Sequence, residues 1–552
     1  MYQLNGPPLT VLPEPLTMGS FVLDVCDRFG DADCLVFDDP LTGETLRWTY
    51  TELGQQARRV AKALLARGVT KGTRVGVLTS NRPEGVAAFF GAALTGAVVV
   101  PLSTFSPKPE LAQMLQDADI AVLLTQTAMS RRRFVDDLVE LVPSLANGTV
   151  LRDPAFPHLR HVAAIGADSD PTEIESWETF LAGGDDVRDN LLDAIAGSVR
   201  PSDLALVIFS SGTTSKPKGV LHNHQSPTLQ FWVQAQLFGR DTTTRIWSAL
   251  PMFWTAGINT VMGSTLAAGG CWVMQEGFDA ATALTLMERE RVTEPYTLPH
   301  QAAALEECPD WAHTDLSSLT KVFGKSVFTR HPTVAGDPDW NMPVGYGLSE
   351  ACAFVVAHPY TATREQMKGS IGQLLAGNQL RIIDPDTGRQ LGPNEDGELA
   401  IRGLTLMEHY IGRSRAECFD ADGFFHTGDM GFVDDDEFVH FTGRRTEMIK
   451  TGGANVSPAE IEVQLRACEP VKLARIIGVP DARLDQLVVL CVVLKDGYDT
   501  TADDLCDFLR ARIASYKLPK RVLFFADGEI PMTSSDTKVR DHDLVELVKV
   551  RL

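Results

Sequence analysis

The sequence has little positive charge for its size. Its 552 residues carry 50 lysines and arginines against 72 aspartates and glutamates, a formal net charge of −22 at pH 7. Proteins that bind nucleic acid or an anionic membrane need a basic surface, so this balance argues against both kinds of partner. Any site for a small anion must therefore be a local concentration of positive charge.

Features of an exported or membrane-embedded chain are also missing. No apolar run approaches the roughly 20 residues of a membrane-spanning helix. The N-terminus has neither a basic segment nor a continuous apolar one. The nine cysteines are odd in number and show no Cys-x-x-Cys spacing. We expect them to be reduced, buried thiols of a cytoplasmic protein.

One short stretch organises what is present. Leu204 to Phe209 reads as a buried strand, and S-S-G-T-T-S-K-P-K-G follows from Ser210 to Gly219. Hydroxyls, lysines and a glycine that exposes backbone N–H groups form a cradle suited to a polyphosphate. The stretch lacks the G-x-x-x-x-G-K-[ST] spacing of the common phosphate loop. A solvated Ser/Thr-rich turn is the alternative interpretation.

Helical patterns alternate with short apolar strands through the first part of the chain. Thr51 to Arg67 and Pro83 to Leu94 have helical spacing, while Arg74 to Thr79 and Val98 to Val100 are typical of strands. This alternation predicts an α/β architecture with mainly parallel strands. We also expect a strand at Leu319 to Phe323.

The character of the sequence changes twice further on. Apolar segments followed by turn residues predict a small β subdomain near residues 375 to 440. After Gly443 a compact set of strands and helices begins. We therefore place a domain boundary there, which gives domains of residues 1–443 and 444–552. The acidic stretch Asp168 to Gly197 is expected to lie irregularly over the surface.

Eight further motifs occur in order around the Ser210 to Gly219 stretch. They are Trp48 to Leu53 (WTYTEL), Leu94 to Leu102 (LTGAVVVPL), Tyr346 to Glu350 (YGLSE), Gly397 to Leu399 (GEL), His426 to Asp429 (HTGD), Gly443-Arg444, Ser515 to Pro519 (SYKLP) and Pro531 to Lys538. Together they resemble the motifs of the adenylate-forming superfamily, which contains acyl-CoA synthetases, firefly luciferase and the adenylation domains of peptide synthetases. The resemblance covers nearly the whole chain.

This resemblance implies a fold and a reaction. The fold is a large N-terminal α/β domain with a small β subdomain, followed by a small, mobile α+β C-terminal domain that swivels between two catalytic poses. In the first half-reaction a carboxylate attacks the α-phosphate of ATP and gives an acyl adenylate and pyrophosphate. In the second a thiol, usually that of coenzyme A, takes the acyl group and releases AMP. ATP, Mg²⁺ and coenzyme A are the implied cofactors.

We interpret the protein as an ATP-dependent acyl-CoA ligase acting on an apolar acid, either fatty or aryl. Joining two anions needs cations and positioning more than a nucleophilic side chain, which agrees with the lack of a recognisable Ser-His-Asp set. Two alternatives are an adenylating enzyme that loads a separate carrier protein and a nucleotide-binding relative that has lost ligation. The expected partners are small molecules, and we also allow for a homodimer.

The resemblance assigns residues to the nucleotide and the metal. The ATP and AMP contacts are Ser210, Ser211, Gly212, Thr213, Thr214, Lys218, Tyr346, Gly347, Ser349, Asp429 and Arg444. Glu350 and Thr214 are the implied Mg²⁺ ligands, because a hard cation takes oxygen ligands. The catalytic candidates are Lys538, Glu350 and Lys450. For Glu350 the alternative is a carboxylate that serves a helix start, and for Lys538 it is a solvated surface lysine.

Further residues are assigned to the acid and the thiol. Trp254, Phe253 and Gly345 are the acid-pocket candidates, and the family most often has histidine where Trp254 stands. An indole there would fill or gate the pocket, whereas the alternative is a core tryptophan turned away from it. The candidates for the coenzyme A path are Gly452, Gly453 and Lys517. Peptide-synthetase domains usually carry methionine where Lys517 sits, which favours free coenzyme A as acceptor.

Besides Trp254, two positions and one short segment depart from the family pattern. Thr537 stands where glycine usually precedes the catalytic lysine, and Thr446 stands at a hinge position that is usually Asp or Lys. Phe323 to Ser326 (FGKS) replaces a Gly-Gly-Ala-Pro sequence beside the adenine. These departures bear on the geometry of the C-terminal loop, of the hinge and of the adenine edge.

Overall fold

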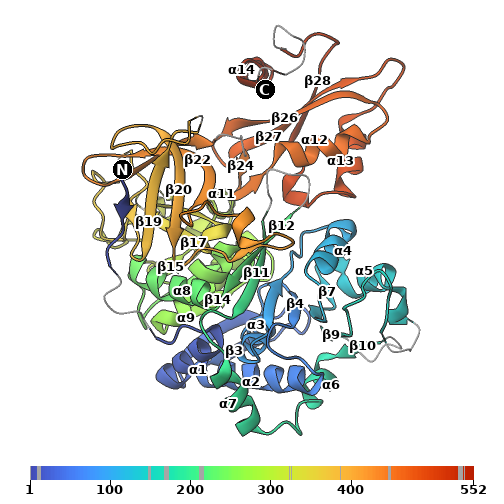
Figure 1. Ribbon diagram of the computed structural model, residues 1–552, viewed down its shortest axis with the longest axis vertical. Helices are drawn as coiled ribbons and strands as arrows, with labels where there is room; N and C mark the ends of the chain where they lie inside the picture. The colour runs from blue at the N-terminus through green and yellow to red at the C-terminus, as the bar shows by residue number, and fades with distance from the viewer. Residues whose placement is uncertain are drawn as a thin grey trace.

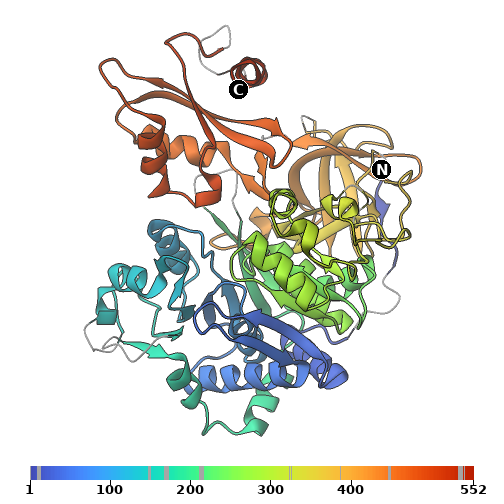
Figure 2. The same cartoon turned by 180° about the vertical axis from the view of Figure 1, so that it is seen from behind.

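The computed structural model describes residues 2–8, 14–146, 151–166, 173–210, 217–322, 324, 326–367, 369–385, 387–444, 449–531, 539 and 541–552. The N-terminal part forms the bulk of the molecule (Figure 1). The C-terminal part, coloured orange to red, lies at one end of it in both opposed views (Figures 1 and 2).

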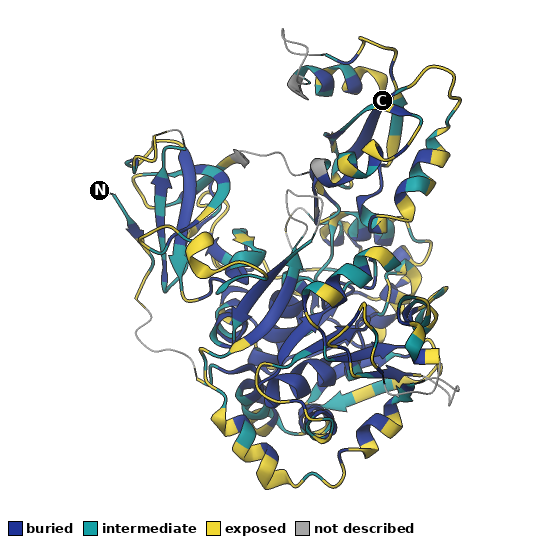
Figure 3. Cartoon of the chain, turned by 45° about the vertical axis from the view of Figure 1, so that its right-hand side comes forward, coloured by how far each residue is buried: buried dark blue, intermediate teal, exposed yellow. Residues whose placement is uncertain are grey.

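The larger sheet of the N-terminal part has the strand order β10-β9-β6-β4-β5-β11-β12-β21. Pairing is parallel from β10 to β11 and antiparallel at β12 and β21. Its strands are β4 (Arg74–Leu78), β5 (Val98–Pro101), β6 (Val122–Gln126), β9 (His161–Ile165), β10 (Ile174–Ser176), β11 (Leu204–Ser210), β12 (Lys218–Asn223) and β21 (His409–Tyr410). Its central strands are buried (Figure 3).

A second sheet of the same part has the order β15-β13-β14-β2-β3. Only β3 pairs antiparallel among its described strands. The strands are β2 (Asp33–Asp38), β3 (Thr45–Thr49), β13 (Arg245–Ser248), β14 (Cys271–Met274) and β15 (Glu294–Pro295). A short hairpin, β7 (Ala128–Met129) with β8 (Arg132–Arg133), stands apart.

Alternate strand residues assign the helices to layers. On β2, Leu35 and Phe37 belong to the core between the two sheets, and Val36 belongs to the core on the outer face, as the period of a strand requires. The helices of the inner core are α1 (Met18–Phe29), α2 (Tyr50–Ala66), α3 (Pro83–Leu94), α6 (Trp177–Ala182), α7 (Asp189–Ser198), α8 (Gln225–Leu237) and α9 (Ser264–Ala268). Helices α4 (Lys108–Asp117) and α5 (Phe134–Leu141) cover the larger sheet, and α10 (Ala280–Arg289) and α11 (Pro299–Glu306) cover the second.

The β subdomain is an antiparallel sheet of order β1-β19-β20-β22-β23. Its strands are β1 (Leu4–Asn5), β19 (Asn378–Ile383), β20 (Gly397–Gly403), β22 (Phe425–Val433) and β23 (Val439–Arg444). A three-stranded sheet of β16 (Gly345–Leu348), β17 (Ala353–Ala357) and β18 (Gln373–Leu374) accompanies it. The predicted small β subdomain is therefore confirmed.

The C-terminal domain is α+β, as expected. Its sheet has the order β25-β24-β27-β26, and β28 pairs with β27. The elements are β24 (Ile449–Thr451), β25 (Ala454–Val456), α12 (Pro458–Arg466), β26 (Val471–Asp481), β27 (Asp485–Leu494), α13 (Ala502–Arg510), η7 (Ser515–Lys517), β28 (Arg521–Phe524) and α14 (Asp541–Arg551). The boundary after residue 443 stays a prediction, because residues 445–448, with Thr446, lie outside the described part.

Two local expectations are wrong. Residues 319–322 form no strand, because the N–H groups of Thr320 and Lys321 both bond to the carbonyl of Thr293; Phe323 lies outside the described residues. The acidic stretch is more regular than expected within residues 173–197. Its helices α6 and α7 bury Phe180 and Leu192 in the inner core, and burial of these apolar side chains outweighs the acidity of the segment.

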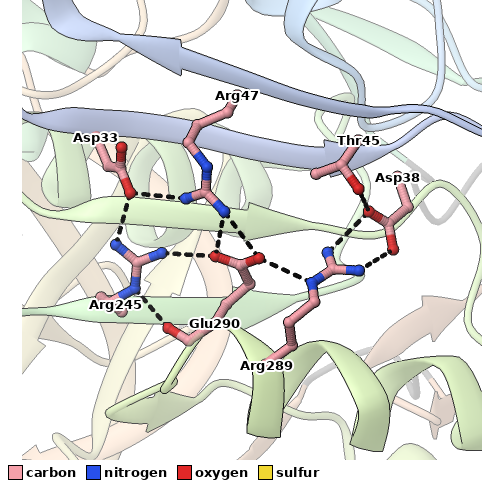
Figure 4. A network of polar contacts seen from close by, with 7 residues as sticks. All are labelled: Asp33, Asp38, Thr45, Arg47, Arg245, Arg289 and Glu290. Carbon is pink, nitrogen blue, oxygen red and sulfur yellow. Dashed lines mark hydrogen bonds and ion pairs between the residues drawn. The ribbon is translucent and has the colours of Figure 1, made fainter.

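A network of arginines ties the second sheet to the end of α10 (Figure 4). The Glu290 side chain is 5% exposed and lies 2.8 Å from Arg47, 2.9 Å from Arg245 and 2.9 Å from Arg289. Burial by itself raises the pKa of Glu290, but hydrogen bonds and charges from Arg47 and Arg289 outweigh it and lower the pKa below its usual value. The stabilisation is therefore present above the unfolded-state pKa and is lost as the pH falls.

We expect Glu290→Gln to destabilise the N-terminal part by about 2 kcal/mol, because it removes a buried carboxylate that accepts hydrogen bonds from three partly exposed guanidinium groups. Those groups keep their contacts with Asp33 and Asp38, which limits the loss. The urea midpoint of unfolding should fall at pH 7, and the difference from the wild type should shrink in acid. Glu306, which pairs with the half-exposed Arg330, supplies the control: Glu306→Gln should cost under about 1 kcal/mol. Equal losses for the two variants would contradict the role of the network.

Candidate active site

A cavity of about 540 Å³, called here the larger cavity, lies where the larger sheet, the β subdomain and the C-terminal domain meet. Ser210 lines it from the carboxyl end of β11, where open α/β sheets place their ligands. Lys218 lines it from the start of β12, and Gly453 reaches it from the C-terminal domain. The cavity therefore collects residues from the large domain from Ile208 onward, from its β subdomain and from the C-terminal domain.

The predicted phosphate loop is the connection of a β-hairpin. Strands β11 and β12 pair antiparallel, with Ser210 opposite Lys218, so both ends of the loop open on the larger cavity. Ser211, Gly212, Thr213, Thr214 and Lys216 lie outside the described residues. The phosphate-binding role of the loop therefore stays a prediction.

Tyr410 organises the charged groups beside this loop. Its hydroxyl donates to Glu350 Oε1 at 2.7 Å, and its ring lies 5.5 Å from Lys218 Nζ and 5.8 Å from the Arg413 guanidinium carbon. Burial and the Glu350 charge raise the pKa of Tyr410, so the phenol stays a proton donor. Lys218 and Arg413 form a local concentration of positive charge. Neither Tyr410 nor Arg413 was predicted, because each belongs to no recognised motif.

Tyr346 and Asp429 are brought together as the motifs imply. The Tyr346 hydroxyl donates to Asp429 Oδ2 at 2.6 Å, and Asp429 is buried. Their neighbours Gly347, Ser349 and Gly428 line the larger cavity. Asp429 stands opposite Arg444 in the β22–β23 register, and the Arg444 side chain lies outside the described part of the structure.

A carboxylate that was not predicted as a site residue holds the irregular part of β22 before Asp429. Glu398 lines the larger cavity, accepts the N–H of Gly428 at 2.9 Å and lies 3.0 Å from His426 Nδ1. Hydrogen bonding to Glu398 raises the pKa of His426, with help from the Asp420 charge. The GEL and HTGD motifs thus act as one unit, which their spacing in the sequence did not show.

Trp254 lies in a wall between two cavities. A smaller cavity of about 300 Å³ shares Phe253, Trp254, Ala454 and Tyr516 with the larger one. The Trp254 ring is half-buried and meets Tyr516 edge-on, with ring centroids 6.1 Å apart. A π-helix, η2 (Ala256–Gly263), follows directly, and such helices are frequent at functional sites.

The remaining acid-pocket candidate, Gly345, is not among the residues lining either cavity. A Cβ built on Gly345 would lie 2.5 Å from the carbonyl oxygen of Val356. Close packing of β16 on β17 therefore explains why glycine stands at position 345. From the sequence alone, such packing cannot be distinguished from contact with a ligand.

The glycine pair of the C-terminal domain faces the large domain. Gly452 lines the smaller cavity and Gly453 the larger. A Cβ on Gly453 would lie 2.4 Å from Leu298 Cδ2, and one on Gly452 would lie 3.1 Å from His300 Nδ1. Both glycines have positive φ, +55° for Gly452 and +80° for Gly453. The β24–β25 hairpin therefore passes close over the start of α11, in a backbone conformation that favours glycine.

The lysines are placed less simply. Lys450 is exposed and lies 5.3 Å from the centre of the Phe441 ring. Lys517 does not line either cavity but is buried between Glu460 and Glu110. Lys520, which was not predicted, lines the smaller cavity. Lys538 and Thr537 lie outside the described residues.

The chain is similar to known proteins over most of its length. The family model of AMP-binding enzymes matches residues 23–411, and that of the AMP-binding enzyme C-terminal domain matches residues 460–536. The chain therefore belongs to the AMP-binding enzyme family, in the acyl-CoA synthetase branch of the adenylate-forming superfamily. It is an ATP-dependent acid–CoA ligase, and the resemblance found in the sequence is confirmed.

Several of its relatives are named for aromatic acids. A feruloyl-CoA synthase of Amycolatopsis sp is 32% identical, over 88% of this chain and 91% of its own. An indoleacetate–CoA ligase of Aromatoleum aromaticum is 32% identical, over 91% and 93%. Among solved structures, the amide bond synthetase McbA from Marinactinospora thermotolerans has a TM-score of 0.75 at 25% identity, covering 96% of this chain and 99% of its own. Within the described residues no helix is long and apolar enough to cross a membrane.

Tyr410→Phe should slow adenylate formation by roughly 10–100-fold, since a hydrogen bond to a charged group contributes about 1.5–3 kcal/mol. The ring beneath Lys218 is kept, so the loss reports on the bond to Glu350 alone. Pyrophosphate release measures it. Tyr498, whose hydroxyl donates to Glu469 at the surface, provides the matched control, and Tyr498→Phe should leave the rate unchanged. An unaltered rate in Tyr410→Phe would show that Glu350 needs no such support.

Proposed function

We propose that this ligase activates an aryl carboxylic acid and transfers the acyl group to coenzyme A. The carrying observation is the position of Trp254, in the wall that the two cavities share. Phe253 and Tyr516 stand beside it in edge-on contacts, an arrangement that suits an aromatic ring. The aromatic acids in the relatives' names support this class over a fatty acid.

The larger cavity would hold the acyl adenylate. Ser210, Ser211, Gly212, Thr213, Thr214 and Lys218 would hold the phosphates, while Tyr346, Gly347, Ser349, Asp429 and Arg444 would hold the nucleoside. The acid would lie toward Phe253 and Trp254, so that its carboxylate meets the α-phosphate. Lys218 and Arg413 would offset the charge of two anions brought together.

Mg²⁺ would lie between Glu350 and the phosphate loop, with Thr214 as a second oxygen ligand. The Glu350 carboxylate lines the cavity, as Lys218 at the end of that loop does, and hard oxygen donors fit this ion. The ion would neutralise phosphate charge. Tyr410 would orient the Glu350 carboxylate toward it.

The smaller cavity would receive the thiol arm of coenzyme A. It runs along Gly452 and His300 to Lys520, whose charge suits a phosphate group. Burial, and secondarily the Lys520 charge, lowers the pKa of His300, so this imidazole is neutral at pH 7. Because the two cavities share a wall, the thiol would meet the acyl carbonyl there. We therefore assign the described arrangement of domains to the second half-reaction.

Two other acceptors can be told apart from coenzyme A. A carrier protein would present the same kind of arm. McbA is named an amide bond synthetase, and in this chain an amine acceptor would meet the Glu276 carboxylate in the smaller cavity. The nine free cysteines support a cytoplasmic location.

Purified protein should be given ATP, Mg²⁺ and a panel of aryl and fatty acids, with coenzyme A, a carrier protein or an amine as acceptor. AMP release that depends on coenzyme A and is fastest with an aryl acid is the expected result. Activity with only fatty acids would overturn the acid class. AMP release that depends on another acceptor would contradict transfer to coenzyme A. Absence of pyrophosphate exchange would contradict formation of an adenylate.

Lys538→Ala and Gly453→Val should separate the two half-reactions. Lys538→Ala should slow adenylation by roughly 10²–10³-fold, as for loss of one electrostatic donor, and spare thioester formation from preformed acyl adenylate. Gly453→Val should slow thioester formation by roughly 100-fold and spare adenylation, because its Cβ would displace the hairpin from Leu298. Gly497→Val is the control: Gly497 also has positive φ, but a Cβ there meets nothing within 4 Å. If either variant slowed both halves equally, its assignment would be wrong.

Trp254→Ala should change the choice of acid. An apolar contact in a pocket discriminates by about 1–3 kcal/mol, so the kcat/KM ratio between bulky and small acids should rise by roughly 10–200-fold. A series of aryl acids of increasing size measures this ratio. Phe278→Ala removes an aromatic side chain that lines only the smaller cavity and should leave the acid ratio unchanged. A constant ratio in folded Trp254→Ala would remove Trp254 from the acid pocket.

A further inference from the structure

Lys517 is a buried cation at the contact between the two domains. Its side chain is 1% exposed, and Nζ lies 2.7 Å from Glu460 Oε1 and 3.8 Å from Glu110 Oε1. Glu460 belongs to α12 of the same domain, whereas Glu110 belongs to α4 of the large domain. One ammonium group therefore joins carboxylates from both domains.

The two carboxylates differ in whether their contact with Lys517 depends on the arrangement of the domains. The Lys517–Glu460 pair lies within the C-terminal domain and persists wherever that domain moves. The Lys517–Glu110 contact exists only while α4 lies beside η7. Glu110 is held in place on its own side, because Ser106 Oγ donates to Glu110 Oε1 at 3.0 Å. Charges this well buried attract one another more strongly than surface pairs. The contact therefore favours this one arrangement of the domains.

The same turn delivers an aromatic ring to the cavity wall. Tyr516, next to Lys517, has its ring centroid 6.1 Å from that of Trp254 and 6.5 Å from that of Phe105. Phe105 lies just before α4, and Glu110 lies in the first turn of that helix. Phe105 contacts Tyr516, and Glu110 contacts Lys517. The ionic contact therefore fixes how Tyr516 packs against the wall shared by both cavities.

We propose that Glu110 is a positioning residue for the acyl-transfer half of the reaction, which holds Tyr516 and the Gly452–Gly453 hairpin against the cavities through Lys517. The inference rests on the proposed function, because it presumes the two half-reactions. Glu110 touches neither cavity and acts only by stabilising the pose. Its loss should therefore leave the first half-reaction intact.

Glu110→Gln tests this, since it removes the charge and keeps the size. Thioester formation from preformed acyl adenylate should fall by about tenfold, within the range of typical coupling between sites. Single-turnover pyrophosphate release and the thermal unfolding temperature should stay at the wild-type values. Glu140→Gln is the control: Glu140 pairs with Lys108 at the start of the same helix, but its side chain is 64% exposed. It should change neither half-reaction.

A double-mutant cycle with Lys517→Met decides whether the effect passes through the lysine. Glu110→Gln should have no further effect in the Lys517→Met background, since the contact is already lost. Additive effects, equal slowing of both halves, or an unchanged thioester rate would each overturn the proposal. A wild-type enzyme that forms no thioester would instead overturn the proposed function, so the two failures are distinguishable.

Discussion

Both cavities depend on the contact of one turn of the C-terminal domain with the large domain. Tyr516 closes the wall that the cavities share, and Lys517 beside it is buried among carboxylates. Aromatic edge-on contacts and a charged contact act together over two successive residues. An aromatic contact alone tolerates sliding, whereas a buried charge has few acceptable positions. The combination defines where the glycine hairpin lies.

Charge is distributed locally against the acidic background of the chain. In the larger cavity the cations Lys218 and Arg413 flank Tyr410, and the carboxylates nearby have assigned donors: Tyr410 for Glu350, Tyr346 for Asp429, and Gly428 for Glu398. A carboxylate that already accepts such a hydrogen bond has a fixed orientation, so it can contact a metal ion or a ribose in one defined way. The net charge of the protein therefore says little about the site.

The hairpin form of the phosphate loop also has a consequence for how ATP is held. The described ends of strands β11 and β12, Ser210 and Lys218, line the larger cavity. In the proposed binding mode, side chains and backbone of several motifs share the polyphosphate, so each motif contributes only a few residues.

The sequence by itself determined the family, the fold class and the order of the motifs, because these rest on local patterns: strand and helix periodicity, turn glycines and short runs around Ser210, Tyr346 and Asp429. Only the tertiary structure decided which side chains share a cavity. It placed Tyr410 and Glu398 in the site, explained Gly345 by strand packing, and put Lys520 rather than Lys517 beside the smaller cavity. The physical reason is that burial and ion pairing arise from segments far apart in the chain, such as α4 and η7, whose meeting leaves no periodicity in either one.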